Sequence, residues 1–175
     1  GKVMDNVTMT SKILKMERNY AVYLPPGYET SERSYPVLYL LHGATDNHTG
    51  WVQFGEVLHI TDKAIREGKA TPMIIVMPDA DTKVMGYYDV PGWDYEKFMF
   101  EEFIPHVEQK YRIKAQKRFR AVAGLSMGGG GSHNFLKFFG IADGKILSNN
   151  GENSVTYTED SRELGSLLPN TDVLF

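Results

Sequence analysis

A glycine-flanked serine that directly follows an apolar run constrains this chain more than any other feature. The segment Gly124-Leu125-Ser126-Met127-Gly128 fits the pattern G-x-S-x-G. It follows the apolar run 119–123, and the residues after it, including Phe135 and Leu136, suit a helix. This setting is typical of a nucleophile elbow, a strained strand-to-helix turn that lifts a serine hydroxyl clear of a sheet. A plain glycine-rich turn is the alternative, whereas a phosphate loop would need a Gly-Lys-Ser/Thr ending that the chain lacks.

The rest of the chain alternates strand-like and helix-like patterns. Strands are predicted over Val7 to Leu14, Asn19 to Leu24, Tyr35 to Leu41, Met73 to Met77 and Phe119 to Ala123. Helices are predicted over Ile60 to Glu67 and over Tyr95 to Tyr111, the second kinked or restarted at Pro105. This order predicts an α/β fold, a mostly parallel sheet covered on both faces, with an antiparallel hairpin at its N-terminal edge.

Composition bounds the class of protein. A chain of 175 residues with 42% hydrophobic and 23% charged residues suits one domain, residues 1–175. The net charge of -3 gives no electrostatic reason to expect a nucleic-acid partner. Apolar stretches fall far short of the roughly 20 residues of a membrane span, so we expect no membrane partner. The absence of cysteine excludes disulfides, thiolate zinc sites and cysteine nucleophiles.

A second motif, His42-Gly43-Ala44, follows the predicted strand 35–41. Acyl transfer needs two backbone N–H donors for the oxyanion, one after the serine and one in the loop after a nearby strand. Met127 and Ala44 are therefore the predicted oxyanion hole. His42 is predicted to hold this loop, because the triad base follows the serine in chain order. Trp51 either packs the loop or lines the acyl pocket, and the sequence leaves both readings open.

Aromatic residues gather in the loop 79–95, where Tyr87, Tyr88, Trp93 and Tyr95 accompany four aspartates. Such faces suit a phenolic acid or a sugar, so Tyr87 and Trp93 join Trp51 as candidate substrate-binding residues. Packing against the sheet edge is an equally good interpretation. We expect solvated aspartates rather than a calcium site there. Glu102 and His106 lack a third ligand, so no metal site is predicted and no cofactor is required.

Four runs of the chain resemble a known family: SKIL (11–14), RNYAVYLPPGY (18–28), YPVLYLLHG (35–43) and AGLSMGG (123–129). They are similar to the "Putative esterase" family of α/β-hydrolases. That family includes the feruloyl and acetyl-xylan esterases of carbohydrate esterase family 1 and is related to esterase D, an S-formylglutathione hydrolase. The resemblance implies a three-layer α/β-hydrolase sandwich, Ser126 as nucleophile, and a secreted or periplasmic location. The PPGY run, without a cysteine near the HG motif, favours the bacterial feruloyl-type enzymes.

The triad of this fold is incomplete in the sequence. Its order is serine, then an acid, then histidine. Only 49 residues follow Ser126, too few for the strand-helix-strand units that carry both partners. His133 lies seven helical residues on, about 10 Å along the axis and behind the hydroxyl, which argues against it as general base. The end, Asp172-Val173-Leu174-Phe175, looks like the start of a further strand, so we expect the 175 residues to stop before the triad is complete. Three explanations stay open: a fragment, residues missing from the sequence, or a shortened form that lacks a triad.

These patterns predict a serine carboxylic-ester hydrolase that works through an acyl-enzyme on feruloyl or acetyl esters of plant cell-wall polysaccharide. The alternative is a noncatalytic carbohydrate-binding or interaction protein derived from an esterase, which the missing acid and histidine would suit. The expected partner is a small-molecule or polysaccharide ester. The sequence leaves the oligomeric state open.

Overall fold

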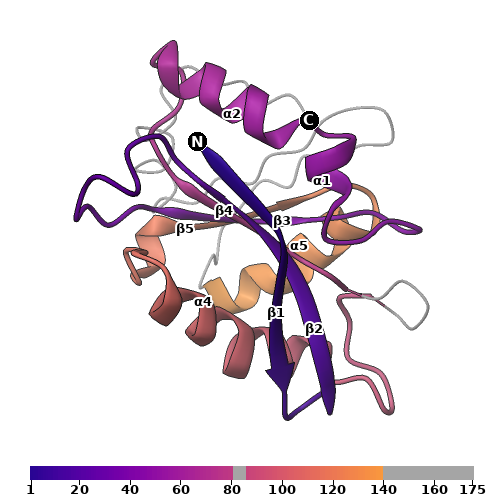
Figure 1. Cartoon of the computed structure of the whole chain (residues 1–175). Helices are drawn as coiled ribbons and strands as arrows, with labels where there is room; N and C mark the ends of the chain where they lie inside the picture. The colour runs from indigo at the N-terminus through magenta and orange to yellow at the C-terminus, as the bar shows by residue number, and fades with distance from the viewer. Residues whose placement is uncertain (81–85, 140–175) are drawn as a thin grey trace.

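A mixed five-stranded sheet organises the fold. The computed structural model describes residues 1–80 and 86–139. The strands, in the spatial order β1-β2-β4-β3-β5, are β1 (Lys2–Ser11), β2 (Met16–Leu24), β3 (Val37–Leu41), β4 (Ile74–Pro78) and β5 (Arg120–Gly124). The helices are α1 (Gly50–Gln53), α2 (Val57–Arg66), α3 (Tyr95–Phe98), the π-helical turn η1 (Met99–Phe103), α4 (Ile104–Lys110), the 3-10 turn η2 (Lys117–Phe119) and α5 (Met127–Phe139). Helices α1 and α2 lie on one face of the sheet, and α4 and α5 lie on the other (Figure 1). The predicted α/β sandwich is confirmed.

Strand pairing also follows the prediction. Strands β1 and β2 form an antiparallel hairpin at one edge, β2 pairs antiparallel with β4, and β3 pairs parallel with both β4 and β5. The hairpin extends further than expected, since β1 begins at Lys2 rather than Val7. A register shift between Met4 and Val7 interrupts its apolar alternation, and the polar residues Asp5 and Asn6 lie there. A bulge of this kind hides a strand from a period-two pattern.

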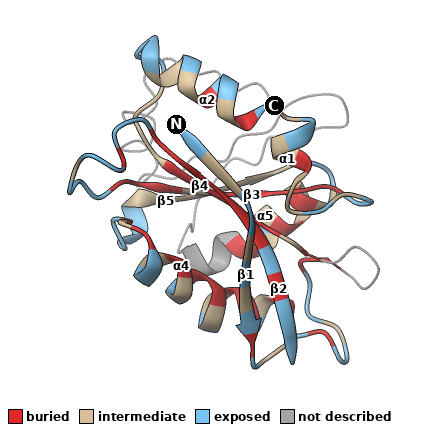
Figure 2. Ribbon diagram, in the orientation of Figure 1, coloured by how far each residue is buried: buried red, intermediate tan, exposed pale blue. Residues whose placement is uncertain are grey.

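Alternation along the inner strands divides the core between two faces. On β2, Tyr20, Val22 and Leu24 face the layer of α4 and α5, whereas Ala21 and Tyr23 face the layer of α1 and α2. Figure 2 shows buried residues along the central strands and the inner sides of the helices. Successive side chains of a strand point to opposite faces, so a strand covered on both sides must be apolar throughout. This accounts for the nearly continuous apolar runs of the sequence.

The predicted helix 95–111 is divided into three parts. Pro105 lies in the first turn of α4, a position where proline is tolerated. The wide turn η1 comes directly before it. Glu102 of this turn accepts hydrogen bonds from the Ser11 hydroxyl (2.5 Å) and from the Lys12 and Ile13 N–H groups (3.0 and 3.2 Å), which ties the β1–β2 turn to the helix layer.

One helix was not predicted from the sequence, and some predictions concern residues outside the described ranges. The short helix α1 had no prediction. Asp81, one of the four aspartates of the loop 79–95, and the predicted strand 172–175 lie outside the described residues. Across residues 1–80 and 86–139, no helix is long and apolar enough to cross a membrane.

Candidate active site

Ser126 occupies a strained turn between β5 and α5. Its φ is 54°, in the left-handed region that costs a residue with a side chain roughly 1–2 kcal/mol. The turn is tight, because a Cβ added to Gly124 would collide with the backbone of Gly128. Ser126 is exposed, and the preceding Leu125 N–H donates to the Leu41 carbonyl at the end of β3 (3.3 Å). The serine therefore stands clear of the carboxyl edge of the sheet, where ligands of such sheets bind.

The loop after β3 lies against this turn. A Cβ built on Gly43 would be 3.7 Å from the Ser126 Cβ and 3.4 Å from the Leu125 carbonyl oxygen. Ala44 follows on the exposed side, and Thr45 turns the chain with a φ of 67°. Within residues 1–80 and 86–139, neither the Ala44 nor the Met127 N–H donates a hydrogen bond. Met127 directly follows Ser126, and Ala44 directly follows Gly43, which lies against the serine, so their role as oxyanion donors stays a prediction.

His42 is part of the scaffold of this loop. Its side chain is 1% exposed, and its Nε2 accepts a hydrogen bond from the Ala80 N–H (3.0 Å). Nδ1 then carries the proton and donates to the Gly43 carbonyl (2.8 Å). These contacts join the ends of β3 and β4, as the sequence-based hypothesis for His42 requires.

Asp79 lies at the centre of a polar cluster beneath the loop. The buried Arg18 donates to its backbone carbonyl (2.6 Å), and the Tyr95 hydroxyl donates to the same oxygen (3.0 Å). Its carboxylate lies 3.5 Å from His42 Nε2 and 3.8 Å from His48 Nδ1. Burial lowers the pKa of His48, and the attraction of Asp79 opposes this only in part. The cluster brings a carboxylate, a guanidinium and two imidazoles together beside the His42 loop.

Trp51 packs the loop. Its Nε1 donates to the Leu41 carbonyl (3.1 Å), and its ring joins the apolar cluster beneath α1 and α2. It is partly buried, and these contacts support the packing role.

Two candidate substrate-binding residues of the aromatic loop, Tyr87 and Trp93, are buried in the structure. Tyr87 is 0% exposed and donates its hydroxyl to the His42 carbonyl (3.2 Å). Trp93 is 4% exposed, stacks on Tyr95 and donates its Nε1 to the Gly86 carbonyl (2.8 Å). Rings buried in this way pack the loop, which favours the packing interpretation of Tyr87 and Trp93, and their role in substrate binding stays a prediction. Tyr88, between them, is 38% exposed.

Four consecutive glycines explain how this loop reaches the elbow helix. A Cβ on Gly131 would lie 2.7 Å from the Tyr87 ring, and one on Gly130 would lie 2.5 Å from the Tyr88 hydroxyl. The glycine run of α5 was a signal in the sequence for a close neighbour, which the elbow motif alone did not reveal.

The histidines place no base beside the serine. His133 is exposed on α5. The ring of His106 lies 3.4 Å from the Tyr20 hydroxyl, whereas Glu102 contacts the β1–β2 turn, so the two residues make separate contacts. Within residues 1–80 and 86–139, no histidine is hydrogen-bonded to Ser126, and no group of three or more acidic or histidine side chains could hold a metal.

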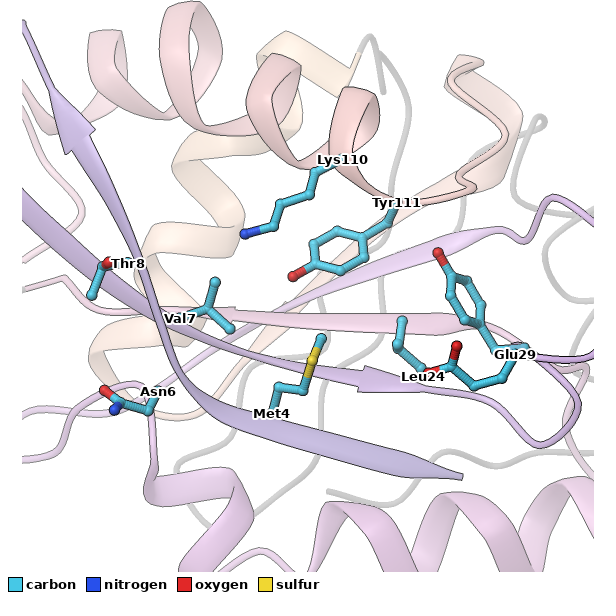
Figure 3. A pocket seen from close by; sticks show the side chains of 9 residues that line it. Met4, Asn6, Val7, Thr8, Leu24, Glu29, Lys110 and Tyr111 are labelled. Carbon is cyan, nitrogen blue, oxygen red and sulfur yellow. The ribbon is translucent and has the colours of Figure 1, made fainter.

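A groove of about 500 Å³ lies away from this site, between β1 and α4. Figure 3 shows Lys110 and Tyr111 pointing from α4 toward Val7 and Met4 of β1. The Lys110 amine is already engaged, since it donates to the Tyr20 hydroxyl (3.1 Å). This groove contains none of the residues that surround the serine.

Comparisons with known proteins agree with the geometry. Residues 11–134 match the family described as "Putative esterase". The endo-1,4-beta-xylanase/feruloyl esterase of Xylanibacter ruminicola is 36% identical over 133 residues, 72% of this chain and 18% of that protein. A ferulic acid esterase structure is 44% identical with a TM-score of 0.75, covering 78% of this chain and 55% of that one.

A further structure is the carbohydrate esterase family 1 ferulic acid esterase of Anaeromyces mucronatus in complex with ferulic acid. It is 31% identical, with a TM-score of 0.60, and the match covers 73% of this chain and 49% of that one. The chain thus spans about half of each matched esterase structure. The family match covers the elbow, the loop at His42 and the sheet that carries them. The chain belongs to the "Putative esterase" family, whose members have the α/β-hydrolase fold.

Proposed function

We propose that this chain carries the nucleophile and the oxyanion hole of a serine carboxylic-ester hydrolase. The observation that carries the proposal is the exposed Ser126, held at a φ of 54° between β5 and α5 with Gly43 packed against it. A strained serine at the carboxyl edge of a sheet suits nucleophilic attack, because a turn of this kind presents the hydroxyl to a ligand.

The reaction would proceed through an acyl-enzyme. The Ser126 Oγ attacks the ester carbonyl carbon, and the N–H groups of Ala44 and Met127 stabilise the negative charge that develops on the carbonyl oxygen. A general base takes the serine proton and passes it to the leaving alcohol. Water then cleaves the acyl-enzyme by the same path, releases the acid and restores the serine. No step calls for a cofactor.

The general base remains a prediction. His42 is committed to the loop, and His133 lies on the exposed side of α5, beyond the first turn after the serine. The hypothesis from the sequence is that a histidine beyond the 175 residues completes the triad, together with an acid.

Feruloyl or acetyl esters of plant cell-wall polysaccharide are the substrates that we favour. Two of the similar proteins are a xylanase/feruloyl esterase and a ferulic acid esterase, and both share more than a third of their aligned residues with this chain. The exposed Tyr88 beside the elbow helix supports an aromatic acid.

Intact-mass spectrometry before and after treatment with a fluorophosphonate probe tests the chemistry. We expect a single adduct that is lost in the Ser126→Ala variant. The mass of the untreated protein, compared with 19.8 kDa for the 175 residues, shows whether further residues are present. A 19.8 kDa protein that forms no adduct would refute the esterase proposal for this chain. It would favour the alternative, a noncatalytic carbohydrate-binding or interaction protein.

Substrate comparison tests the ester. Hydrolysis of methyl ferulate, acetylated xylan and S-formylglutathione is measured with equal enzyme concentrations, and Ser126→Ala provides the blank. Turnover of the ferulate or the xylan supports the cell-wall assignment. Turnover of the thioester alone contradicts it while leaving the serine hydrolase chemistry intact.

A further inference from the structure

Residues 86–88 run along the first turns of α5. A Cβ on Gly86 would lie 2.6 Å from the Met127 sulfur, and the Tyr88 and Tyr87 side chains lie against Gly130 and Gly131. Three successive loop residues thus follow the helix that begins directly after Ser126. Only glycine permits this approach at Gly130, because any Cβ there would displace the Tyr88 hydroxyl.

Tyr88 is close to the nucleophile along this helix. The Gly130 N–H donates to the Ser126 carbonyl (3.1 Å), so Gly130 lies one helical turn below the serine on the same side. The Tyr88 hydroxyl therefore lies against the first turns of α5, the helix that begins directly after Ser126. No partner within residues 1–80 and 86–139 hydrogen-bonds to this hydroxyl.

The structure holds Tyr88 in place from both sides. The Tyr87 hydroxyl is bound to the His42 carbonyl (3.2 Å), and the Trp93 indole is bound to the Gly86 carbonyl (2.8 Å). Val90 and Trp93 exchange backbone hydrogen bonds of 3.0 and 2.8 Å, which closes the turn. Tyr87, Trp93 and Tyr95 are at most 4% exposed, whereas Tyr88 is 38% exposed. The buried rings support the loop, and Tyr88 is the ring that it presents.

We propose that the Tyr88 ring forms a wall of the acyl pocket beside Ser126 and selects aromatic acyl groups over acetyl. The proposal rests on the proposed hydrolase function and identifies the residue that sets its substrate class. An exposed ring held at a fixed position gives an aromatic acid both buried apolar area and an edge or offset-stacked contact. An acetyl group is too small to gain either. A preference of roughly tenfold is the expected contribution of such a ring.

Two esters with the same alcohol, 4-nitrophenyl ferulate and 4-nitrophenyl acetate, isolate the acyl group. In Tyr88→Ala we expect the ratio of kcat/KM for ferulate to that for acetate to fall about tenfold. Tyr88→Phe keeps the ring and should hold the ratio within threefold. Gly130→Ala should lower the ratio with Tyr88 intact, because the added methyl displaces the ring. Ile60→Ala, an exposed apolar residue on the opposite face of the sheet, is the matched control.

A change of less than threefold in Tyr88→Ala overturns the proposal. An equal loss in Tyr88→Phe and Tyr88→Ala also overturns it, since the hydroxyl and not the ring would then select the substrate.

Binding distinguishes a failure of this proposal from a failure of the hydrolase function. Ferulate is titrated by calorimetry into Ser126→Ala and into the double variant Ser126→Ala with Tyr88→Ala. The Kd should rise at least fivefold in the double variant, whether or not the parent hydrolyses an ester. A fluorophosphonate adduct together with unchanged ferulate binding refutes the role of Tyr88 alone. Ferulate that binds neither protein refutes the aromatic pocket.

Discussion

Gly128 and Gly129 are neighbours in α5, yet alanine should have opposite effects at the two positions. A Cβ on Gly128 would lie 2.7 Å from the His42 carbonyl oxygen and closer still to that of Leu41. Both obstacles are backbone atoms at the end of β3, so no side-chain rotation relieves the contact. A Cβ on Gly129 would meet only the Gly124 carbonyl oxygen, at 3.4 Å.

The magnitudes follow from two opposing contributions to the free energy of unfolding. Alanine in a helix is favoured over glycine by about 1 kcal/mol at either position. Overpacking against the backbone costs about 3 kcal/mol at Gly128, the upper end of the usual range, because the carbonyls are fixed by the sheet. We therefore expect Gly128→Ala to lose about 2 kcal/mol and Gly129→Ala to gain up to about 1 kcal/mol. The Tm should fall by roughly 4–8 °C and rise by roughly 2–4 °C, respectively.

Urea unfolding followed by circular dichroism measures both variants beside the parent, with calorimetry for the Tm. Both variants replace glycine by alanine in the same helix, so the contribution of helix propensity cancels when their stabilities are compared. The remaining difference in the free energy of unfolding reports the contact of residue 128 with the end of β3. The reasoning is refuted if Gly128→Ala is as stable as the parent, or if Gly129→Ala loses as much stability as Gly128→Ala.

Three further predictions concern other positions. Ser126→Gly should be about 1 kcal/mol more stable than Ser126→Ala in urea unfolding, because glycine adopts a φ of 54° without the left-handed penalty; equal stabilities would argue against strain. Glu102→Ala should lose about 2 kcal/mol, since the β1–β2 turn loses its carboxylate acceptor, whereas exposed Glu101→Ala should change little; equal losses would contradict the anchor. Burial lowers the pKa of His48, which faces Asp79, Asp5 and His42, so the unfolded chain binds a proton below about pH 6.5 more readily than the folded chain. Stability should fall from pH 7.5 to 5.5, and less steeply in His48→Gln; parallel slopes in urea titrations would rule this out.

Strands β3 and β4 were predictable because they are apolar on both faces and their runs stop near a glycine or a proline. The run that becomes β3 stops at His42-Gly43, and the run that becomes β4 stops at Pro78-Asp79. The elbow was also predictable, because its strand, its glycines and its serine are contiguous in the sequence. Local signals of this kind need no knowledge of tertiary contacts.

What the sequence could not supply depends on contacts between distant segments. Burial decided which aromatic of the loop faces solvent, and the partners that bury Tyr87 are the His42 carbonyl and Gly131, 45 and 44 residues away. The start of β1 was missed because a bulge with two polar residues breaks its alternation. Glu102 resembled an exposed helix residue until the β1–β2 turn was brought beside it.

The glycines of α5 also bear on the order in which the molecule assembles. Each of the four, Gly128 to Gly131, weakens an isolated helix by about 1 kcal/mol relative to alanine, so this segment has little helical tendency of its own. Its first turns become stable only when β3, β5 and the loop at Tyr87 already surround them. We therefore expect the turn at Ser126 to form only after the sheet is in place. Partly folded chains, whether newly made or damaged, would then lack the strained turn on which the proposed hydrolase chemistry depends.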